Sequence, residues 1–369
     1  MLNRIAYEKG PNIYSDMSCT FAQPKFDDEI KKSISKIAYT LVEDFKNMEF
    51  FNESSFHFKG LDLLNSSEIF ISDYSIRFQN FFNMKIEDIY EKERTIDDLI
   101  SKQPLQNEKN NSNDRDVNEF SDEVVGQKIL SYAIGCMMGR YSLDEPGLIY
   151  AHAGNQDFDA SRYQTFPADA DGIIPLTEMH WFEDDATHRI REFLTAVWGK
   201  DTLDANMLWL AESLGKKASE TAEDTIRRYL ASKFYKDHMQ TYKKRPIYWL
   251  FSSGKQGAFQ ALVYLHRYNE STLARMRTEY VMPLISKMAA MVNSLQSEIE
   301  NSDSAAEIKR KEKELQNLHK QQAELSSFEE KLRHYADQRI SLDLDDGVKV
   351  NYGKFGDLLA EVKAVTGEK

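Results

Sequence analysis

The sequence predicts a mainly α-helical fold with a minor β component (α+β), built from helical bodies and an antiparallel coiled-coil hairpin near the C-terminus. Apolar residues recur at helical spacing through much of the chain. One short run, residues 246–251, is continuously apolar and aromatic, which is typical of a buried strand. From Met282 onward two apolar stripes follow one another with a polar break between them, as in two helices that pack together.

The first hundred residues predict a helical spacer. Residues 27–51 form an amphipathic helix, because apolar side chains recur at helical spacing at Ile30, Ile34, Ile37, Leu41, Val42 and Phe45. One or two strands are expected near residues 69–76 and a helix over 76–92. Residues 101–122 are polar and rich in asparagine, which predicts a flexible linker. The first two segments are therefore 1–100 and the linker 101–122.

The central segment, 123–281, is expected to be a recognition-like α+β domain. Its predicted helices are 126–138, 183–198, 203–214 and 221–239, and 139–175 is expected to be mostly loop. Residues 246–251 predict a strand and 252–257 a turn, while 259–266 fits either a second strand or the start of a helix.

The last segment, 282–369, is expected to be a coiled-coil hairpin and a tail. The first stripe consists of Leu284, Met288, Met291, Leu295 and Ile299. The second consists of Ile308, Leu315, Leu318, Leu325, Phe328 and Leu332. Residues 300–305 interrupt the pattern, so two antiparallel helices are favoured over one rod. The tail predicts a turn at 345–347, a short extended piece and a final helix.

Composition excludes several classes of protein. The 369 residues are 41% hydrophobic, with 29% charged side chains. No run of eighteen apolar residues exists, so no membrane span is expected. The N-terminus lacks the apolar centre of a secretory signal. Two cysteines are too few for a disulfide framework, and a cytoplasmic location is expected.

The charge is distributed unevenly. The net charge of −13 argues against a general nucleic-acid coat protein. However, residues 225–280 hold eleven Lys and Arg against three Asp and Glu, whereas 143–185 hold one Arg against ten acids. Two interpretations remain open: the oppositely charged regions pack on each other, or the basic stretch binds an anionic partner.

No catalytic machinery is evident. The segment SSGKQG only superficially resembles a phosphate loop, and the eight prolines never pair as an amine methyltransferase motif requires. No strand-borne nuclease motif is found. Residues 183–185 with His180 and His188 could bind a metal, but capping of the following helix is favoured. We predict no catalytic residue, metal or cofactor for this chain, and a free-standing enzyme would need an active site that the sequence does not show.

The basic stretch gives the positive signal. Its cations are interleaved with aromatic residues and followed by a Ser–Gly turn, a pattern suited to phosphate contacts. The predicted DNA contacts are Arg227, Arg228, Lys233, Lys243, Lys244, Arg245, Lys255 and Gln256. Gln256 and Asn269 are candidates for reading bases. A solvated helix face beside core aromatic residues is the alternative.

Four long strings, 129–151, 171–194, 234–268 and 332–355, closely resemble the C-terminal part of PglX, the adenine-specific DNA methyltransferases of BREX phage-defence systems. The resemblance covers roughly 75–369 and leaves 1–70 unplaced. It implies a parent protein that binds S-adenosylmethionine, methylates adenine N6 in a short asymmetric site and acts with other defence proteins. The cofactor loop and its motif would lie in a part of the family protein outside this chain, which we expect to be a fragment, a split gene product or a cloned domain.

The resemblance therefore favours a non-catalytic DNA-binding and target-recognition region, with double-stranded DNA as partner and no membrane contact. The alternative is an assembly module, in which the hairpin and the acidic loop dock the methyltransferase domain or other BREX proteins.

Overall fold

The computed structural model describes residues 28–49, 53–55, 58–61, 63, 70–101 and 121–367. The start of the expected spacer, residues 1–27, and most of the expected linker lie outside these ranges. The chain divides into two compact units. The first consists of Met1–Lys46 and Asn83–Asn118, and the second of Asn47–Phe82 and Glu119–Lys369. The predicted domain boundaries stay predictions, and each unit is described by itself.

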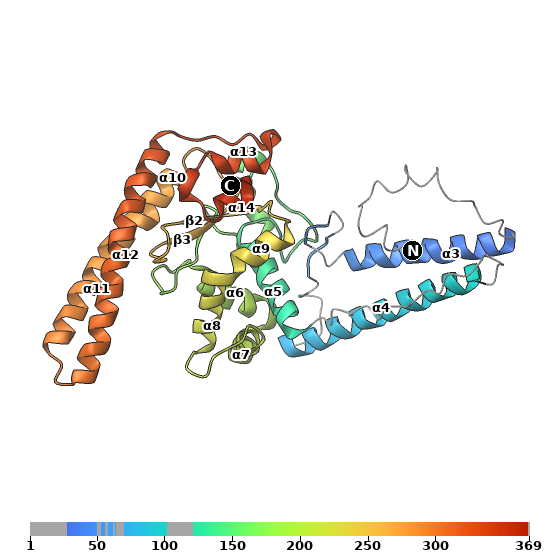
Figure 1. Ribbon diagram of the computed structural model, residues 1–369, viewed down its shortest axis with the longest axis horizontal. Helices are drawn as coiled ribbons and strands as arrows, with labels where there is room; N and C mark the ends of the chain where they lie inside the picture. The colour runs from blue at the N-terminus through green and yellow to red at the C-terminus, as the bar shows by residue number, and fades with distance from the viewer. Residues whose placement is uncertain are drawn as a thin grey trace. The chain divides into compact units, whose positions relative to one another are not determined.

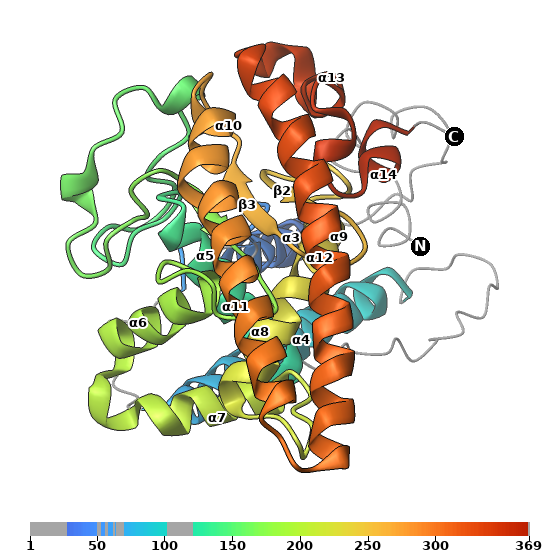
Figure 2. The same ribbon diagram turned by 90° about the vertical axis from the view of Figure 1, so that its left-hand side faces the viewer.

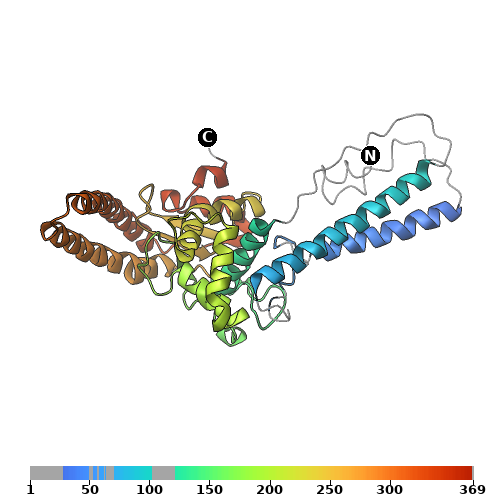
Figure 3. The same cartoon turned by 90° about the horizontal axis from the view of Figure 1, so that it is seen from below.

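The first unit contains two long helices that lie side by side (Figures 1 and 3). These are α3 (Asp28–Glu49), which confirms the predicted helix, and the later half of α4 (Ile71–Ser101). Asp44 of α3 is buried and accepts hydrogen bonds from Lys85 at 3.1 Å and from Lys92. These bonds, the one from Lys92 above all, hold the Asp44 pKa below its usual value. The strand expected at 69–76 is wrong, because α4 begins at Ile71.

Helices form most of the second unit. In chain order they are α5 (Asp122–Met137), α6 (Ala186–Trp198), α7 (Leu203–Ser213), α8 (Ala222–Tyr229), the π-helical turn η5 (Leu230–Phe234) and α9 (Tyr235–Thr241). Short 3-10 turns lie at Ala153–Asn155, Ala160–Arg162 and Lys200–Thr202. The four predicted helices are thus confirmed, although 221–239 contains a π-helical turn that the apolar spacing did not indicate.

A three-stranded antiparallel sheet lies in the core of this unit. Its strands are β1 (Ile173–Pro175), β2 (Tyr248–Ser252) and β3 (Gln260–Tyr264), in the order β1-β3-β2. Tyr248 pairs with Tyr264 and Ser252 with Gln260, so β2 and β3 form a hairpin. The predicted strand is confirmed, and residues 259–266 contain the second strand rather than a helix. Strand β1 occupies a segment expected to be loop.

The C-terminal helices begin with α10 (Thr272–Arg275) and the π-helical turn η6 (Met276–Val281). Two long helices follow, α11 (Met282–Glu300) and α12 (Ala305–Asp337), and they lie side by side (Figure 2). Their buried residues are Leu284, Met288, Val292 and Leu295 on α11, and Leu318, Leu325, Phe328, Leu332 and Ala336 on α12. The polar break lies where the sequence placed it, whereas supercoiling of the pair stays a prediction.

The tail packs back on the sheet. It contains the 3-10 turns Leu344–Asp346 and Gly356–Leu358 and the helices α13 (Gly347–Gly353) and α14 (Val362–Thr366). The extended piece expected after residue 347 is wrong, because α13 begins there. Phe251 of β2 forms an antiparallel bridge with Leu359, and the Ala360 N–H donates to the Leu250 carbonyl at 2.8 Å.

No helix within the described ranges is both long and apolar enough to cross a membrane.

Candidate nucleic-acid interface

The positive charges of residues 225–280 fall into two groups. Five arginines bind acidic or carbonyl groups of the protein itself: Arg227, Arg228, Arg267, Arg275 and Arg277. The other six cations are exposed and form no ion pair with any residue that the structure describes: Lys233, Lys236, Lys243, Lys244, Arg245 and Lys255. A ligand that approaches from solvent would therefore contact mainly the six exposed cations.

Three of the arginines join the basic stretch to the acidic loop 143–185. Arg227 pairs with Asp185, Arg267 donates to the Asp169 and Ala170 carbonyls, and Arg275 lies 3.6 Å from Asp171. Packing of the two oppositely charged regions is thus confirmed for these residues. It accounts for none of the six exposed cations.

Arg227 is the most deeply buried of the predicted DNA contacts, with a side chain that is 7% exposed. Its Nη1 donates to Asp185 Oδ2 at 2.7 Å, while the other oxygen of Asp185 accepts from the His188 N–H at 2.9 Å. Asp185 is the N-cap of α6, which confirms the capping interpretation for this acid. Arg227 therefore has a structural role and is left out of the interface proposed below.

Arg228 is also held internally. Its Nε donates to Glu220 at 2.8 Å and its Nη2 to the Gly215 carbonyl at 3.2 Å. The Arg228 guanidinium is the main reason that the Glu220 pKa lies at about 2. The Arg228 side chain is partly exposed, at 28%, but its charge is largely matched by Glu220.

Residues 243–245, here called the basic turn, follow the end of α9. Lys243 and Lys244 adopt φ values of 49° and 61°, in the left-handed region that non-glycine residues seldom occupy. The Lys244 N–H donates to the Met239 carbonyl at 2.7 Å and closes the helix. Each left-handed residue costs about 1–2 kcal/mol, so the surrounding contacts must hold the basic turn in this form.

Those contacts converge on His238, which is buried. Its Nε2 accepts hydrogen bonds from the backbone N–H groups of Ile247 and Tyr248, both at 3.2 Å. Burial lowers the His238 pKa to about 3, so the ring is neutral and can accept at neutral pH. Tyr242 packs on His238 and donates to Glu53 at 3.0 Å. The basic turn is thereby fixed between α9 and β2.

The remaining predicted contacts lie elsewhere. Lys255 and Gln256 occupy the turn between β2 and β3, at the other end of β2, whose five residues span about 17 Å. The Asn269 side chain accepts from the N–H and the hydroxyl of Ser271, which engages it in a local turn. The structure therefore groups the three residues of the basic turn and separates Lys255 and Gln256 from them.

A cavity of about 200 Å³ lies mainly between α5 and α9. Its polar lining groups bind one another: Tyr229 donates to Asp237 at 2.7 Å, and Ser131 donates to Glu53. Burial lowers the Lys128 pKa. No motif in the sequence marked this cavity, because its lining comes from segments far apart in the chain.

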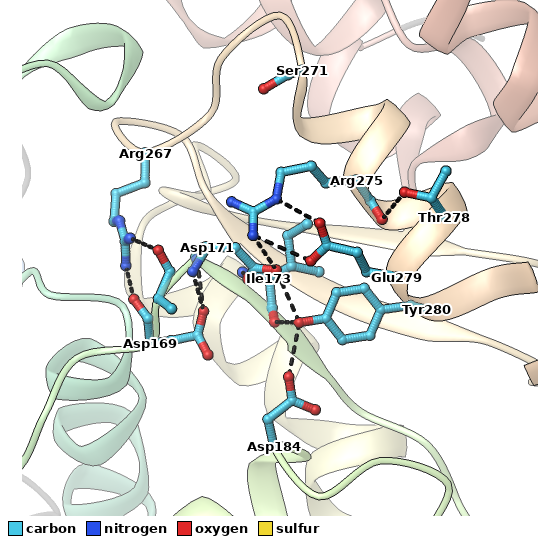
Figure 4. Close-up of polar contacts among 12 residues, drawn as sticks. Asp169, Asp171, Ile173, Asp184, Arg267, Ser271, Arg275, Thr278, Glu279 and Tyr280 are labelled. Carbon is cyan, nitrogen blue, oxygen red and sulfur yellow. Dashed lines mark hydrogen bonds and ion pairs between the residues drawn. The ribbon is translucent and has the colours of Figure 1, made fainter. Parts of the chain in front are cut away.

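A second cluster that sequence reasoning missed is acidic (Figure 4). The Tyr280 hydroxyl lies 3.1 Å from Asp171 Oδ2 and 2.8 Å from Asp184 Oδ2, and Asp171 lies beside Asp169. Burial, and then the neighbouring Asp169, raise the Asp171 pKa to about 7. Burial also raises the Asp184 pKa. Within the described part of the chain no group of His, Cys, Asp or Glu side chains is suited to hold a metal.

The acidic cluster connects three parts of the fold. Asp171 precedes β1, Asp184 precedes α6, and Tyr280 belongs to η6 at the base of the long helix pair. The acids are evident in the sequence as part of the acidic loop. Nothing in the sequence indicates that Tyr280, about a hundred residues later, lies among them.

No family model matches the chain. Two curated proteins are similar to it. The adenine-specific methyltransferase BrxX of Escherichia coli O9:H4 (strain HS) is 54% identical over 265 residues, 69% of this chain and 22% of that protein. The adenine-specific methyltransferase PglX of Lacticaseibacillus casei (strain Zhang) is 44% identical over 228 residues, 61% of this chain and 19% of that protein. The chain thus spans about a fifth of the length of these relatives. On this similarity, the chain is homologous to the BrxX/PglX adenine-specific methyltransferases.

Proposed function

We propose that this chain is a non-catalytic DNA-binding region of a PglX-like adenine-specific DNA methyltransferase, and that its exposed cations contact phosphates. The basic turn carries the proposal. It presents three adjacent cations to solvent, each without an ion pair to a described residue, on a backbone whose two lysines are left-handed. Strained backbone of this kind concentrates at functional sites.

Two more cations extend the array. Lys233 and Lys236 are exposed and stand three residues apart, so they share one side of the helix that leads to the basic turn. Lys236 precedes the turn by seven residues, about 10 Å of helix. Duplex DNA carries one negative charge per about 1.7 Å of axis, so an array of this length faces several phosphates. Contacts of this type position a protein on DNA without reading its sequence.

Methyl transfer is assigned to no residue of this chain. The family protein's S-adenosylmethionine and its adenine target would belong to other parts of that protein, and target recognition by this chain is part of the proposal. Gln256 is exposed and is the candidate for a base contact, whereas Arg227 supports the fold.

Fluorescence anisotropy with a labelled DNA duplex tests the proposal. The variant Lys243→Ala/Lys244→Ala/Arg245→Ala should bind more weakly to every sequence, and the slope of log K against log salt should fall by roughly two to three. The control is Lys309→Ala/Arg310→Ala/Lys313→Ala, which removes three exposed cations from α12 and changes the net charge equally. Equal affinities of the two variants would overturn the assignment.

A second function, assembly with the methyltransferase domain, is favoured by one observation. Helix α3 exposes large apolar side chains at three positions spaced three residues apart: Tyr39 at 68%, Val42 at 46% and Phe45 at 48%. Apolar rows on a helix are typical of protein contacts. The variant Tyr39→Ser/Val42→Ser should abolish co-elution with the methyltransferase region of a PglX homologue, while Lys32→Ser/Lys36→Ser on the same helix should not. Co-elution of both variants would exclude this role.

A further inference from the structure

The turn between β2 and β3 surrounds the carboxylate of Glu324 from α12. Glu324 Oε1 accepts from the Ser253 hydroxyl at 2.8 Å and from the Ala258 N–H at 3.2 Å. Glu324 Oε2 accepts from the Gln256 N–H at 2.7 Å. Three donors from one six-residue stretch therefore converge on a single anionic group that stands more than sixty residues away in sequence.

The backbone of the turn is shaped for a close approach. Gly254 has a φ of 137°, and a Cβ at this position would lie 2.7 Å from Glu324 Oε2. The Phe259 N–H donates to the Ser253 hydroxyl at 2.9 Å and so fixes its orientation toward the carboxylate. Only glycine allows both the backbone angle and the approach of the oxygen.

The same donor set suits a phosphate. The N–H groups of Gln256 and Ala258 point at one carboxylate, while the intervening Gly257 N–H donates to the Gly254 carbonyl at 3.3 Å. Backbone N–H groups that converge in a tight turn form a concave site for anions, and the Ser253 hydroxyl adds a third donor. Lys255 supplies a nearby cation: it is exposed within the turn and forms no ion pair with any described residue, Glu324 included. A carboxylate presents two oxygens to this set, and a tetrahedral phosphate would present the same two plus others to Lys255.

We propose that the β2–β3 turn, residues 252–258, is a phosphate-binding site that Glu324 occupies in this structure, so that Glu324 and a phosphate group compete for the same donors. The further step, that the bound phosphate belongs to the DNA backbone, rests on the proposed function above. The site itself does not, because inorganic phosphate carries the same chemistry. Glu324 acts here as an internal competitor, because its carboxylate occupies the donors that a phosphate would need.

The site is tested with the full chain, inorganic phosphate and hydrogen exchange. In Glu324→Ala the amides of Gln256 and Ala258 lose their acceptor, so their exchange should accelerate on the order of tenfold or more. Inorganic phosphate should slow it again, whereas chloride at equal ionic strength should not. In the unaltered protein, phosphate should leave this segment unchanged. Failure of phosphate to restore protection in Glu324→Ala overturns the proposal.

Three further variants distinguish the effect of an empty site from the effect of lost charge and from misfolding. Glu324→Gln removes the charge but leaves a side chain in the site, so phosphate should protect this segment less than in Glu324→Ala. Glu312→Ala removes an exposed acid about 18 Å along the same helix, and should behave like the unaltered protein. Lys255→Ala in the Glu324→Ala background should weaken phosphate protection. Equal protection in the Ala and Gln variants would contradict competition.

DNA forms the second arm. Glu324→Ala should bind a duplex more tightly than Glu324→Gln, and the gain should disappear with Lys255→Ala. Phosphate protection with no such gain would keep the anion site and exclude DNA as its source of phosphate. A gain without phosphate protection would contradict the site and leave the basic turn as the DNA contact.

Discussion

Arg227 and Asp185 form a buried ion pair, 2.7 Å from Nη1 to Oδ2, between a cation of the basic stretch and the N-cap of α6. Both side chains are almost fully enclosed, at 7% and 1% exposure. Breaking such a pair leaves an uncompensated charge in the interior, which costs about 3–5 kcal/mol. The pair therefore links the stability of α6 to a residue that looks in sequence like a surface cation.

The first prediction follows from this pair. Arg227→Ala should lower the free energy of unfolding by about 3–5 kcal/mol, measured by urea denaturation. Arg245→Ala removes the same side chain from an exposed position, and should change stability by less than about 0.5 kcal/mol while weakening DNA binding. A mild effect of Arg227→Ala would show that the pair contributes little to the fold.

The second prediction concerns pH. The folded-state pKa of Asp171 is about 7, against a reference value of 3.8, so the folded protein binds this proton more tightly than the unfolded chain. The stability that Asp171 contributes should therefore be lost as the pH rises from about 4 to about 7, and Asp184 should act in the same direction, whereas the buried neutral His238 should act in the opposite direction.

Urea denaturation across this pH range measures the effect. Asp171→Asn should remove this negative contribution and so make the slope of stability against pH more positive, whereas Asp157→Asn, at an exposed acid of the same loop, should leave it unchanged. A slope that Asp171→Asn leaves intact would assign the pH dependence to other groups.

The third prediction separates charge from backbone in the basic turn. Lys244→Gly removes the left-handed strain, which offsets the greater chain entropy of glycine, so stability should stay within about 1 kcal/mol. DNA affinity should nevertheless fall, because a cation is lost. The β-branched Lys244→Val should lower both stability and affinity. Full affinity in Lys244→Gly would mean that the turn acts through its shape.

The fourth prediction compares two glycines of α5. A Cβ at Gly135 would lie 2.4 Å from the ring of the buried Tyr141, whereas one at Gly126 would meet the Ser213 hydroxyl, which can rotate away. Gly135→Ala should lower the free energy of unfolding by about 1–3 kcal/mol. Gly126→Ala should be neutral or stabilising by up to about 1 kcal/mol, because alanine favours helix. Thermal unfolding distinguishes the two, and equal melting temperatures would contradict the packing argument.

Local patterns predicted much of the fold because they report on neighbouring residues. Apolar spacing located α6 and α7 within three residues, and the aromatic run located β2. The error at 69–76 has a physical cause. Ile71 begins α4 with its N–H bound to the side chain of Asn206, a distant residue that no local pattern contains. Strand β1 was missed because three residues are too few for a pattern, and its partner β3 defines it.

The candidate site was less predictable. The count of basic residues identified the right stretch, but it could not distinguish Arg227, which faces Asp185, from Lys243, which faces solvent. That distinction depends on tertiary contacts across forty or more residues. The role of SSGKQG depended likewise on Glu324, since the segment lacks a phosphate-loop motif and its donors become evident only around a carboxylate.

The bridge between Phe251 and Leu359 has a practical consequence for shortened forms of the protein. Strand β2 has β3 on one side only, and residues 359–360 cover its other side through the bridge and the Ala360 N–H bond to Leu250. Truncation before Leu359 would uncover a row of unpaired backbone groups on the strand sequence YWLFS. Such exposed edges recruit further strands, so we expect C-terminally shortened forms to aggregate even when every residue of the basic stretch is retained.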